Sequence, residues 1–96
     1  MNLDVVFSLG AERDFDDLFY WIAERAGPAV ALGYTDRLRS YCQDLGLFPE
    51  RARIRTELDE AVRIVCFERR TNVAYVVAEA RVVIVAIHHG GRQSQA

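Results

Sequence analysis

The sequence contains no lysine, and all 12 of its basic side chains are arginine. Codon bias in a genome rich in G and C explains this more simply than selection for the forked guanidinium group that binds phosphate or carboxylate. Acidic residues outnumber the arginines, which gives a formal net charge of −2. We therefore expect no autonomous binding to DNA or RNA, although a local arginine patch could still contact phosphate.

Long apolar runs are absent too, because no stretch of about 18 residues lacks a charge, and the N-terminus has no basic region followed by an apolar segment. We expect no membrane span and no signal peptide, and therefore a cytoplasmic protein.

Cysteine is scarce: Cys42 and Cys66 are far apart, with no C-x-x-C spacing and no nearby histidine to complete a zinc set. This indicates two buried, reduced thiols and predicts neither a disulfide nor a bound metal or cofactor.

With 96 residues, the chain is expected to form one domain over residues 1–96. The short alternating segment from Leu3 to Ser8 predicts a first strand, and Ser8 is placed to cap a helix after it. A helix is predicted from Ala11 to the Gly27-Pro28 break, and a second from Pro28 to about Leu45. The apolar stripe that defines the first helix consists of Phe15, Leu18, Phe19, Ile22, Ala23 and Ala26.

The second half of the chain is rich in β-branched residues and predicts strands. Residues 47–61 have no apolar period and many charges, which indicates a loop, anchored by Phe48 and Leu58. Three strands are expected to follow at Val62–Phe67, Asn72–Val77 and Arg81–Ile87, with tight turns at Arg70-Thr71 and Glu79-Ala80 and a frayed tail over Gly90–Ala96.

The expected fold is therefore α+β: a lead strand, a helical hairpin and an antiparallel three-strand meander. The segment Val82–Ile87 is apolar throughout, so we expect it inside the sheet and not at an edge. The hairpin should pack its apolar stripe on one face of the meander. The predicted core contacts are Leu18, Ile22, Leu38, Leu45, Ile64, Val83 and Val85.

Two groups of polar or aromatic residues on the helices have a simple structural explanation. Glu12, Asp14, Asp16 and Asp17 could suggest a metal or an acid–base pair, but no histidine joins them, and a solvated acidic helix surface is the favoured interpretation. Tyr20, Trp21, Tyr34 and Tyr41 are expected in the core or at its rim, the alternative being an apolar patch for a partner chain. No nucleophile elbow, phosphate-binding loop or dinucleotide fingerprint is present.

One polar cluster remains as a candidate site for binding a target or contacting RNA. Arginine and histidine together can hold a phosphate and move a proton, as RNA cleavage through the 2′-hydroxyl requires. The alternative is that the arginines are solvated turn charges and the histidines simply end a strand, and we favour it for catalysis because no strong base is fixed. As a binding patch the cluster stays open; it consists of Arg63, Arg69, Arg70, His88, His89 and Arg92.

Several short segments occur in an order and spacing that resemble the RelE/ParE superfamily of type II toxin–antitoxin toxins, closer to the ParE branch. The resemblance extends over nearly the whole chain. It rests on Ser8, Ala11, Asp14, the segment 17–25, Gly27, Ala31, Tyr34, Leu38, Leu45, the segment 48–51, Leu58, Arg63, the segment 73–75 and the segment 82–90.

This resemblance implies a toxin that is neutralised by an antitoxin encoded beside it. ParE-like members are associated with poisoning DNA gyrase, whereas RelE-like members cut mRNA on the ribosome. The long helical hairpin and the lack of a basic C-terminal helix favour the ParE type. The expected function is therefore growth inhibition through gyrase by a protein that is not an enzyme. The alternatives are a ribosome-dependent mRNA endoribonuclease and an inactive relative that binds only the antitoxin.

Overall fold

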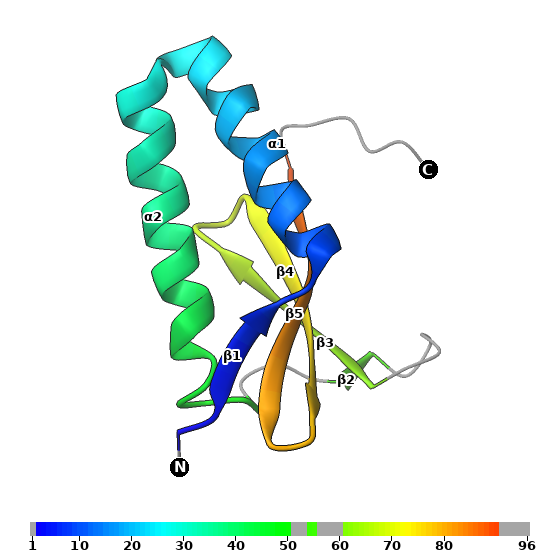
Figure 1. Ribbon diagram of the computed structural model, residues 1–96. Helices are drawn as coiled ribbons and strands as arrows, with labels where there is room; N and C mark the ends of the chain where they lie inside the picture. The colour runs from blue at the N-terminus through cyan, green and yellow to red at the C-terminus, as the bar shows by residue number, and fades with distance from the viewer. Residues whose placement is uncertain (1, 51–53, 56–60, 91–96) are drawn as a thin grey trace.

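The computed structural model describes residues 2–50, 54–55 and 61–90 (Figure 1). None of the helices in these ranges is long and apolar enough to span a bilayer. Chain order follows the predicted α+β plan with one additional short strand. The elements are β1 (Asp4–Phe7), α1 (Leu9–Ala26), α2 (Pro28–Asp44), β2 (Ile54–Arg55), β3 (Val62–Phe67), β4 (Thr71–Ala78) and β5 (Arg81–His89).

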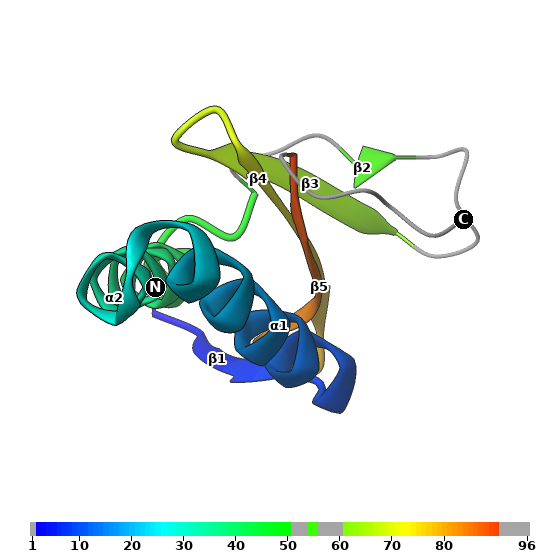
Figure 2. The ribbon, with the colours of Figure 1, turned by 90° about the horizontal axis from the view of Figure 1, so that it is seen from above.

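The strands form a mixed sheet in the order β1-β5-β4-β3-β2. Strands β3, β4 and β5 are antiparallel neighbours, which confirms the predicted meander, and β5 lies inside the sheet as expected. The lead strand β1 pairs with β5 in parallel. The helical hairpin packs on one side of this sheet, with α1 crossing β5 and α2 beyond it (Figures 1 and 2).

Local sequence signals account for the helix ends. The Ser8 side chain accepts a hydrogen bond from the N–H of Ala11 at 3.0 Å, so α1 begins at Leu9, two residues before the predicted start. Gly27 separates the helices with φ of 94°, a conformation that glycine adopts without steric cost. The buried helix positions are Ala11, Phe15, Leu18, Ile22, Ala31, Tyr34, Leu38 and Cys42. Of the stripe predicted for α1, Phe15, Leu18 and Ile22 are buried and Phe19 and Ala23 are partly buried, but Ala26 is exposed.

The helical half of the predicted core is confirmed, since Leu18, Ile22, Leu38 and Leu45 are buried. The strand half was assigned to the wrong face. Ile64, Val83 and Val85 are only partly buried, and their neighbours Val65, Val82 and Ile84 are buried instead. These strands are apolar on both faces, so the alternation that would mark the inner face is missing from the sequence.

A β-bulge at Val85 changes which face of β5 meets the core. Ala74 pairs with Ala86 but Tyr75 pairs with Ile84, so Val85 is the extra residue on β5. The buried positions of β5 accordingly change from Val82 and Ile84 before the bulge to Ile87 and His89 after it. His89 thus faces inward while His88 is exposed.

Two side chains from the start of α1 bond to the backbone beside this bulge. The Ser8 hydroxyl donates to the carbonyl oxygen of Val85 at 3.3 Å, and an Asp14 carboxylate oxygen accepts the N–H of Ile87 at 2.9 Å. Asp14 is half-buried. Its assignment to a purely solvated acidic surface was therefore wrong, because it satisfies a backbone donor of β5.

The turns and the long connection also differ from expectation. The β3–β4 turn comprises residues 68–70, and Thr71 is a buried residue of β4, so the predicted Arg70-Thr71 turn was misplaced. Glu79 and Ala80 form the β4–β5 turn as predicted, both with positive φ.

The connection over residues 47–61, predicted as a loop, contains the short strand β2, which pairs with β3. Phe48, one of its two predicted anchors, is 60% exposed. The Tyr75 hydroxyl also ties this connection to the sheet, because it donates to the Pro49 carbonyl at 2.8 Å. Leu58 and residues 91–96 lie outside the described ranges.

One further correction concerns the thiols. Cys42 is buried in α2 as predicted, but Cys66 is exposed. On β3 it lies between the inward-facing Val65 and Phe67, and the period of two along a strand therefore directs it outward.

Candidate functional site: an arginine-rimmed groove

The structure divides the predicted polar cluster. Arg70 and His89 line one groove, described below, while Arg69 lies exposed in the neighbouring turn. His88, which pairs with Asn72 in the sheet, faces away from His89 and is exposed. Arg92 lies outside the described residues. The two histidines therefore cannot act on the same substrate atom.

Arg63 is also separated from the groove. It is half-buried near the start of β3, in register with Tyr75, whereas the groove lies beyond the other end of that strand. The span from Arg63 to Phe67 along an extended strand corresponds to about 13 Å. The five described members of the cluster thus do not form one patch.

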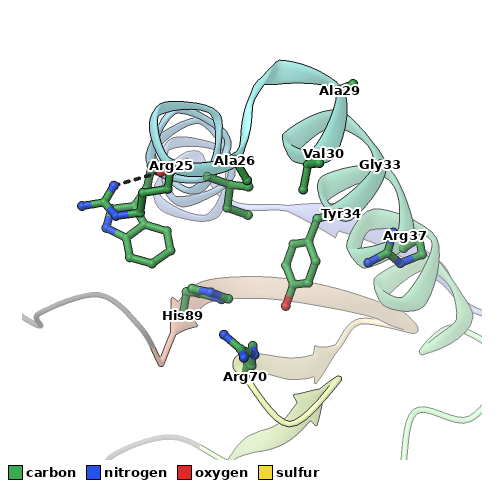
Figure 3. Close-up of a pocket in the computed structure, with 11 residues that line it drawn as sticks. Arg25, Ala26, Ala29, Val30, Gly33, Tyr34, Arg37, Arg70 and His89 are labelled. Atoms are coloured by element: carbon green, nitrogen blue, oxygen red, sulfur yellow. Dashed lines mark hydrogen bonds between the residues drawn. The ribbon is translucent and has the colours of Figure 1, made fainter.

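The groove lies between the hairpin end of the two helices and the β3–β4 turn (Figure 3), with a volume of about 520 Å³. Four elements or connections contribute to it: α1, α2, the β3–β4 turn and the end of β5. Its walls are largely apolar, and three arginines stand around it. The lining residues are Trp21, Ile22, Arg25, Ala26, Ala29, Val30, Gly33, Tyr34, Arg37, Arg70 and His89.

A buried chain of hydrogen bonds closes the inner wall of the groove. The Tyr34 hydroxyl lies 2.5 Å from Oγ1 of Thr71, which lies 2.7 Å from Nδ1 of His89. If Tyr34 donates to Thr71 and Thr71 donates to Nδ1, each hydroxyl acts once as a donor and the imidazole proton resides on Nε2. This chain links α2 to β4 and β5 and fixes the orientation of both rings.

Burial raises the pKa of the Tyr34 phenol above its ordinary value of 10.0, and the Glu68 carboxylate acts in the same direction. The hydrogen bond to Thr71 and the charges of Arg37 and Arg70 lower that pKa in part. Tyr34 is therefore a neutral hydrogen-bond donor at physiological pH and not a base.

Neighbouring arginine and histidine side chains contact the aromatic rings that line the groove. The guanidinium of Arg25 lies 4.1 Å from the centre of the Trp21 ring, and the His89 ring meets Trp21 edge-on at 5.3 Å between centroids. Arg25 also donates to the backbone carbonyl of Trp21 at 2.9 Å. On the opposite side, Arg37 lies 5.4 Å from the Tyr34 ring and pairs with Glu68 at 3.0 Å.

This arrangement suits binding more than catalysis. The only imidazole lining the groove, that of His89, has Nδ1 engaged with Thr71, and no carboxylate lines the groove among the described residues. In the same ranges, no three histidine, cysteine or acidic side chains are grouped to hold a metal ion. Three guanidinium groups around an apolar floor can instead hold an anion that carries an apolar part.

Sequence reasoning placed Arg70 and His89 in the candidate cluster and offered Trp21 and Tyr34 only as an alternative partner patch, but it assigned no binding role to the other groove residues. Trp21 and Arg25 are spaced i, i+4, and Val30, Tyr34 and Arg37 follow at i, i+4 and i+7, so each set lies on one helix face. That spacing could have indicated, for each helix separately, a face that carries aromatic or apolar residues together with arginine. Only the hairpin geometry brings the two faces together with Arg70 and His89.

Comparison with known proteins gives one family and one fold. The family model described as the ParE toxin of the type II toxin-antitoxin system, parDE, matches residues 5–94. A chain from the "Chromosomal ParDE TA system from P. aeruginosa" superposes with a TM-score of 0.80 at 18% sequence identity, covering 91% of this chain and 95% of that one. At this identity the similarity concerns the fold. No curated protein matches the chain significantly.

Proposed function

Since the chain belongs to the ParE toxin family of type II toxin–antitoxin systems, we propose that it inhibits growth by binding DNA gyrase and is neutralised by a cognate antitoxin. On this proposal the chain acts as a binding protein, not as an enzyme. The antitoxin, encoded by the neighbouring gene, would cover the surface of the toxin that meets gyrase.

The observation that supports a binder over a ribonuclease is the separation of His88 from His89. General acid–base cleavage of RNA needs proton-transferring groups that converge on one phosphodiester. Here the alternation along β5 directs the two imidazoles to opposite faces of the sheet, the bulge at Val85 makes His89 the inward one, and Nδ1 of His89 is engaged with Thr71. Arg63, a third member of the predicted cluster, lies toward the other end of β3.

Induced expression of the chain, with and without the neighbouring gene, tests the proposal. We expect growth arrest with a DNA-damage response, and accumulation of cleaved DNA when purified chain is added to gyrase and plasmid. Co-expression of the neighbour should restore growth and yield a complex that melts at a higher temperature, because a ligand that binds only the folded state stabilises it.

Two histidine variants serve as the control for RNA cleavage. His88→Ala alters an exposed side chain, and His89→Asn keeps a hydrogen-bonding group near Thr71 while removing the imidazole. Both folded variants should remain toxic. Rapid mRNA cleavage by the wild type that is lost in either variant would overturn the proposal in favour of a RelE-like endoribonuclease. A chain that binds its antitoxin without affecting growth or gyrase would be an inactive relative.

A further inference from the structure

We propose that the open edge of β1 is a docking site for an extended, basic segment of a partner protein, which would add a further strand to the sheet. Neither this edge nor such a partner is part of the proposed function. The edge lies beside the C-terminal end of α2, whereas the arginine-rimmed groove lies beside the start of that helix. Val30 in the groove and Gln43 at the edge are about 20 Å apart along α2.

The backbone of β1 has hydrogen-bonding groups that point away from the sheet. β1 is the last strand on its side of the sheet, and no described element lies beyond it (Figures 1 and 2). Ser8 donates its N–H to a carbonyl of β5, whereas Leu3 donates in the opposite direction, to Gly46, so the amide direction alternates along the strand. Val5 and Phe7 follow the same alternation as Leu3 and therefore direct their N–H and C=O groups toward the open edge.

β1 also lacks the features that usually prevent another strand from pairing with an edge. A lysine, a proline or a bulge within the strand is the common protection. β1 contains none of these, its register with β5 is unbroken from Asp4 to Phe7, and Val6 is 37% exposed. Because the strand has only four residues, backbone pairing needs support from side-chain contacts.

A concave surface beside the edge, which we call the edge pocket, has room for such contacts. It is lined by residues 2–6 together with Gln43, Asp44 and Leu47, and its volume is about 580 Å³. Val6 and Leu47, which is 47% exposed, provide apolar surface. Side chains of an added strand alternate between two faces, so every second one would lie over the edge pocket.

The edge pocket selects positive charge. Asp4 and Asp44 line it, none of its described lining residues is basic, and neither carboxylate has an ion-pair partner among the described residues. Asp44 ends α2, where the helix dipole already places partial negative charge, and the last turn contains no basic residue. Arg81, in register with Asp4, offsets part of this charge, whereas Arg39, which lies over the Phe7 ring, is paired with Glu12. Lysine or arginine side chains of a partner complement the remainder.

Two synthetic peptides of equal length test this site, one that alternates valine with lysine and one that alternates valine with glutamate. Anisotropy of the labelled peptides measures binding. We expect the lysine peptide to bind, and to bind more weakly as salt is added, and the glutamate peptide not to bind. Methylation of alternate backbone nitrogens should abolish binding of the lysine peptide in one register and preserve it in the other, because only one edge of an added strand pairs with β1.

Amide hydrogen exchange locates the bound peptide on the chain. The amides of Val5 and Phe7 should exchange about tenfold or more slowly when the lysine peptide is bound, because they gain a hydrogen-bond partner. The amide of Ser8 already donates to β5 and should change little. This alternating pattern distinguishes strand addition from binding through side chains alone.

Three variants and two matched controls make the test specific. Asp4→Arg and Asp44→Arg reverse exposed charges of the edge pocket and should each lower the affinity about tenfold or more. Val6→Lys places a repelling charge on the edge strand and should have a similar effect. Asp16→Arg on α1 and Val77→Lys on β4 make the same changes at exposed positions outside the edge pocket and should bind like the wild type. Circular dichroism and melting show whether each variant is folded.

Several outcomes would overturn this inference. One is equal binding of the lysine and glutamate peptides, and another is full binding by both methylated peptides. A third is an equal loss of affinity in Asp4→Arg and Asp16→Arg. If sedimentation shows a dimer of the free chain in which Val5 and Phe7 are already protected from exchange, a second copy occupies the edge and the proposed partner is rejected. Because the probes are synthetic peptides, none of these results depends on whether the chain acts on gyrase.

Discussion

The two cysteines lie in opposite environments although the sequence gives no reason to distinguish them. Burial in α2 raises the pKa of the Cys42 thiol from 9.0 to about 12, an effect that the charge of Arg39 only partly opposes. Cys66 is exposed on β3. Because the thiolate is the reactive form of cysteine, Cys42 is both inaccessible and chemically inert near neutral pH.

We expect one thiol per molecule to react rapidly with dithionitrobenzoate in the native protein and the second only after unfolding in urea. Cys66→Ser should remove the rapid phase, and Cys42→Ala should leave it unchanged. Two thiols that react at the same rate in the folded chain would contradict the burial of Cys42.

The Cys42 thiol also predicts a pH dependence of stability. Its pKa is higher in the folded chain than in the unfolded one, so the unfolded chain loses this proton first as the pH rises. The contribution of Cys42 is therefore complete below about pH 9 and is lost progressively from about pH 9 toward 12. Urea unfolding at pH 8 and pH 10.5 should show a smaller loss of stability in Cys42→Ala than in the wild type. An equal loss in both would contradict this assignment.

Among the elements, β5 is held by two side chains from a distant part of the chain. The bulge at Val85 is tied to the start of α1 by the Ser8 hydroxyl and the Asp14 carboxylate. Ser8 has a second role as the cap of α1. The N-terminal cap and second turn of α1 therefore stabilise the strand geometry that turns His89 toward the groove.

Ser8→Ala and Asp14→Ala should each lower the free energy of unfolding by about 1 to 2 kcal/mol, since each leaves backbone groups without a partner. Asp16→Ala is the matched control, because Asp16 is an exposed carboxylate on the same helix and should change stability by less than about 0.5 kcal/mol. Urea unfolding measures all three. A control variant as unstable as Asp14→Ala would argue against the bond to Ile87.

The turn after α2 requires glycine because the backbone of the lead strand passes close to it. A Cβ atom at Gly46 would overlap the backbone carbonyl oxygen of Leu3, and Leu3 donates its N–H to Gly46 at 2.9 Å. Gly46→Ala should therefore separate the lead strand from α2 and cost about 2 kcal/mol or more. Gly33→Ala, inside α2 with space around it, should instead stabilise the fold by up to about 1 kcal/mol. Thermal melting should show a lower melting temperature for Gly46→Ala than for the wild type and a higher one for Gly33→Ala.

For the whole molecule, stability rests on one core between the helical hairpin and the sheet. Leu38 is fully buried in this core, while Leu32 on the same helix is 54% exposed. Leu38→Ala should cost about 2 to 5 kcal/mol, much of the total stability of a domain this small. Leu32→Ala should cost less than about 1 kcal/mol. Similar unfolding midpoints in urea for the two variants would place Leu38 outside the core.

The sequence by itself determined the elements whose signals are local. The apolar positions of the helices recur at the period of a helical face, so Leu18, Ile22 and Leu38 were assigned correctly to the core. Ser8 and the Gly27-Pro28 break were assigned correctly because capping and helix termination depend on neighbouring residues. The order and spacing of several short segments also carried a resemblance to the RelE/ParE superfamily, and the match to the ParE family model confirms it.

Only the tertiary structure decided which faces meet. The strands are apolar on both sides, so the choice of Val65, Val82 and Ile84 over their neighbours depended on packing against the hairpin. The bulge that turns His89 inward is held by side chains more than 70 residues away in sequence, from a part of the chain that no local pattern on β5 can report. The groove likewise exists only because α1, α2, the β3–β4 turn and β5 converge, and no pattern within one segment shows that these residues meet.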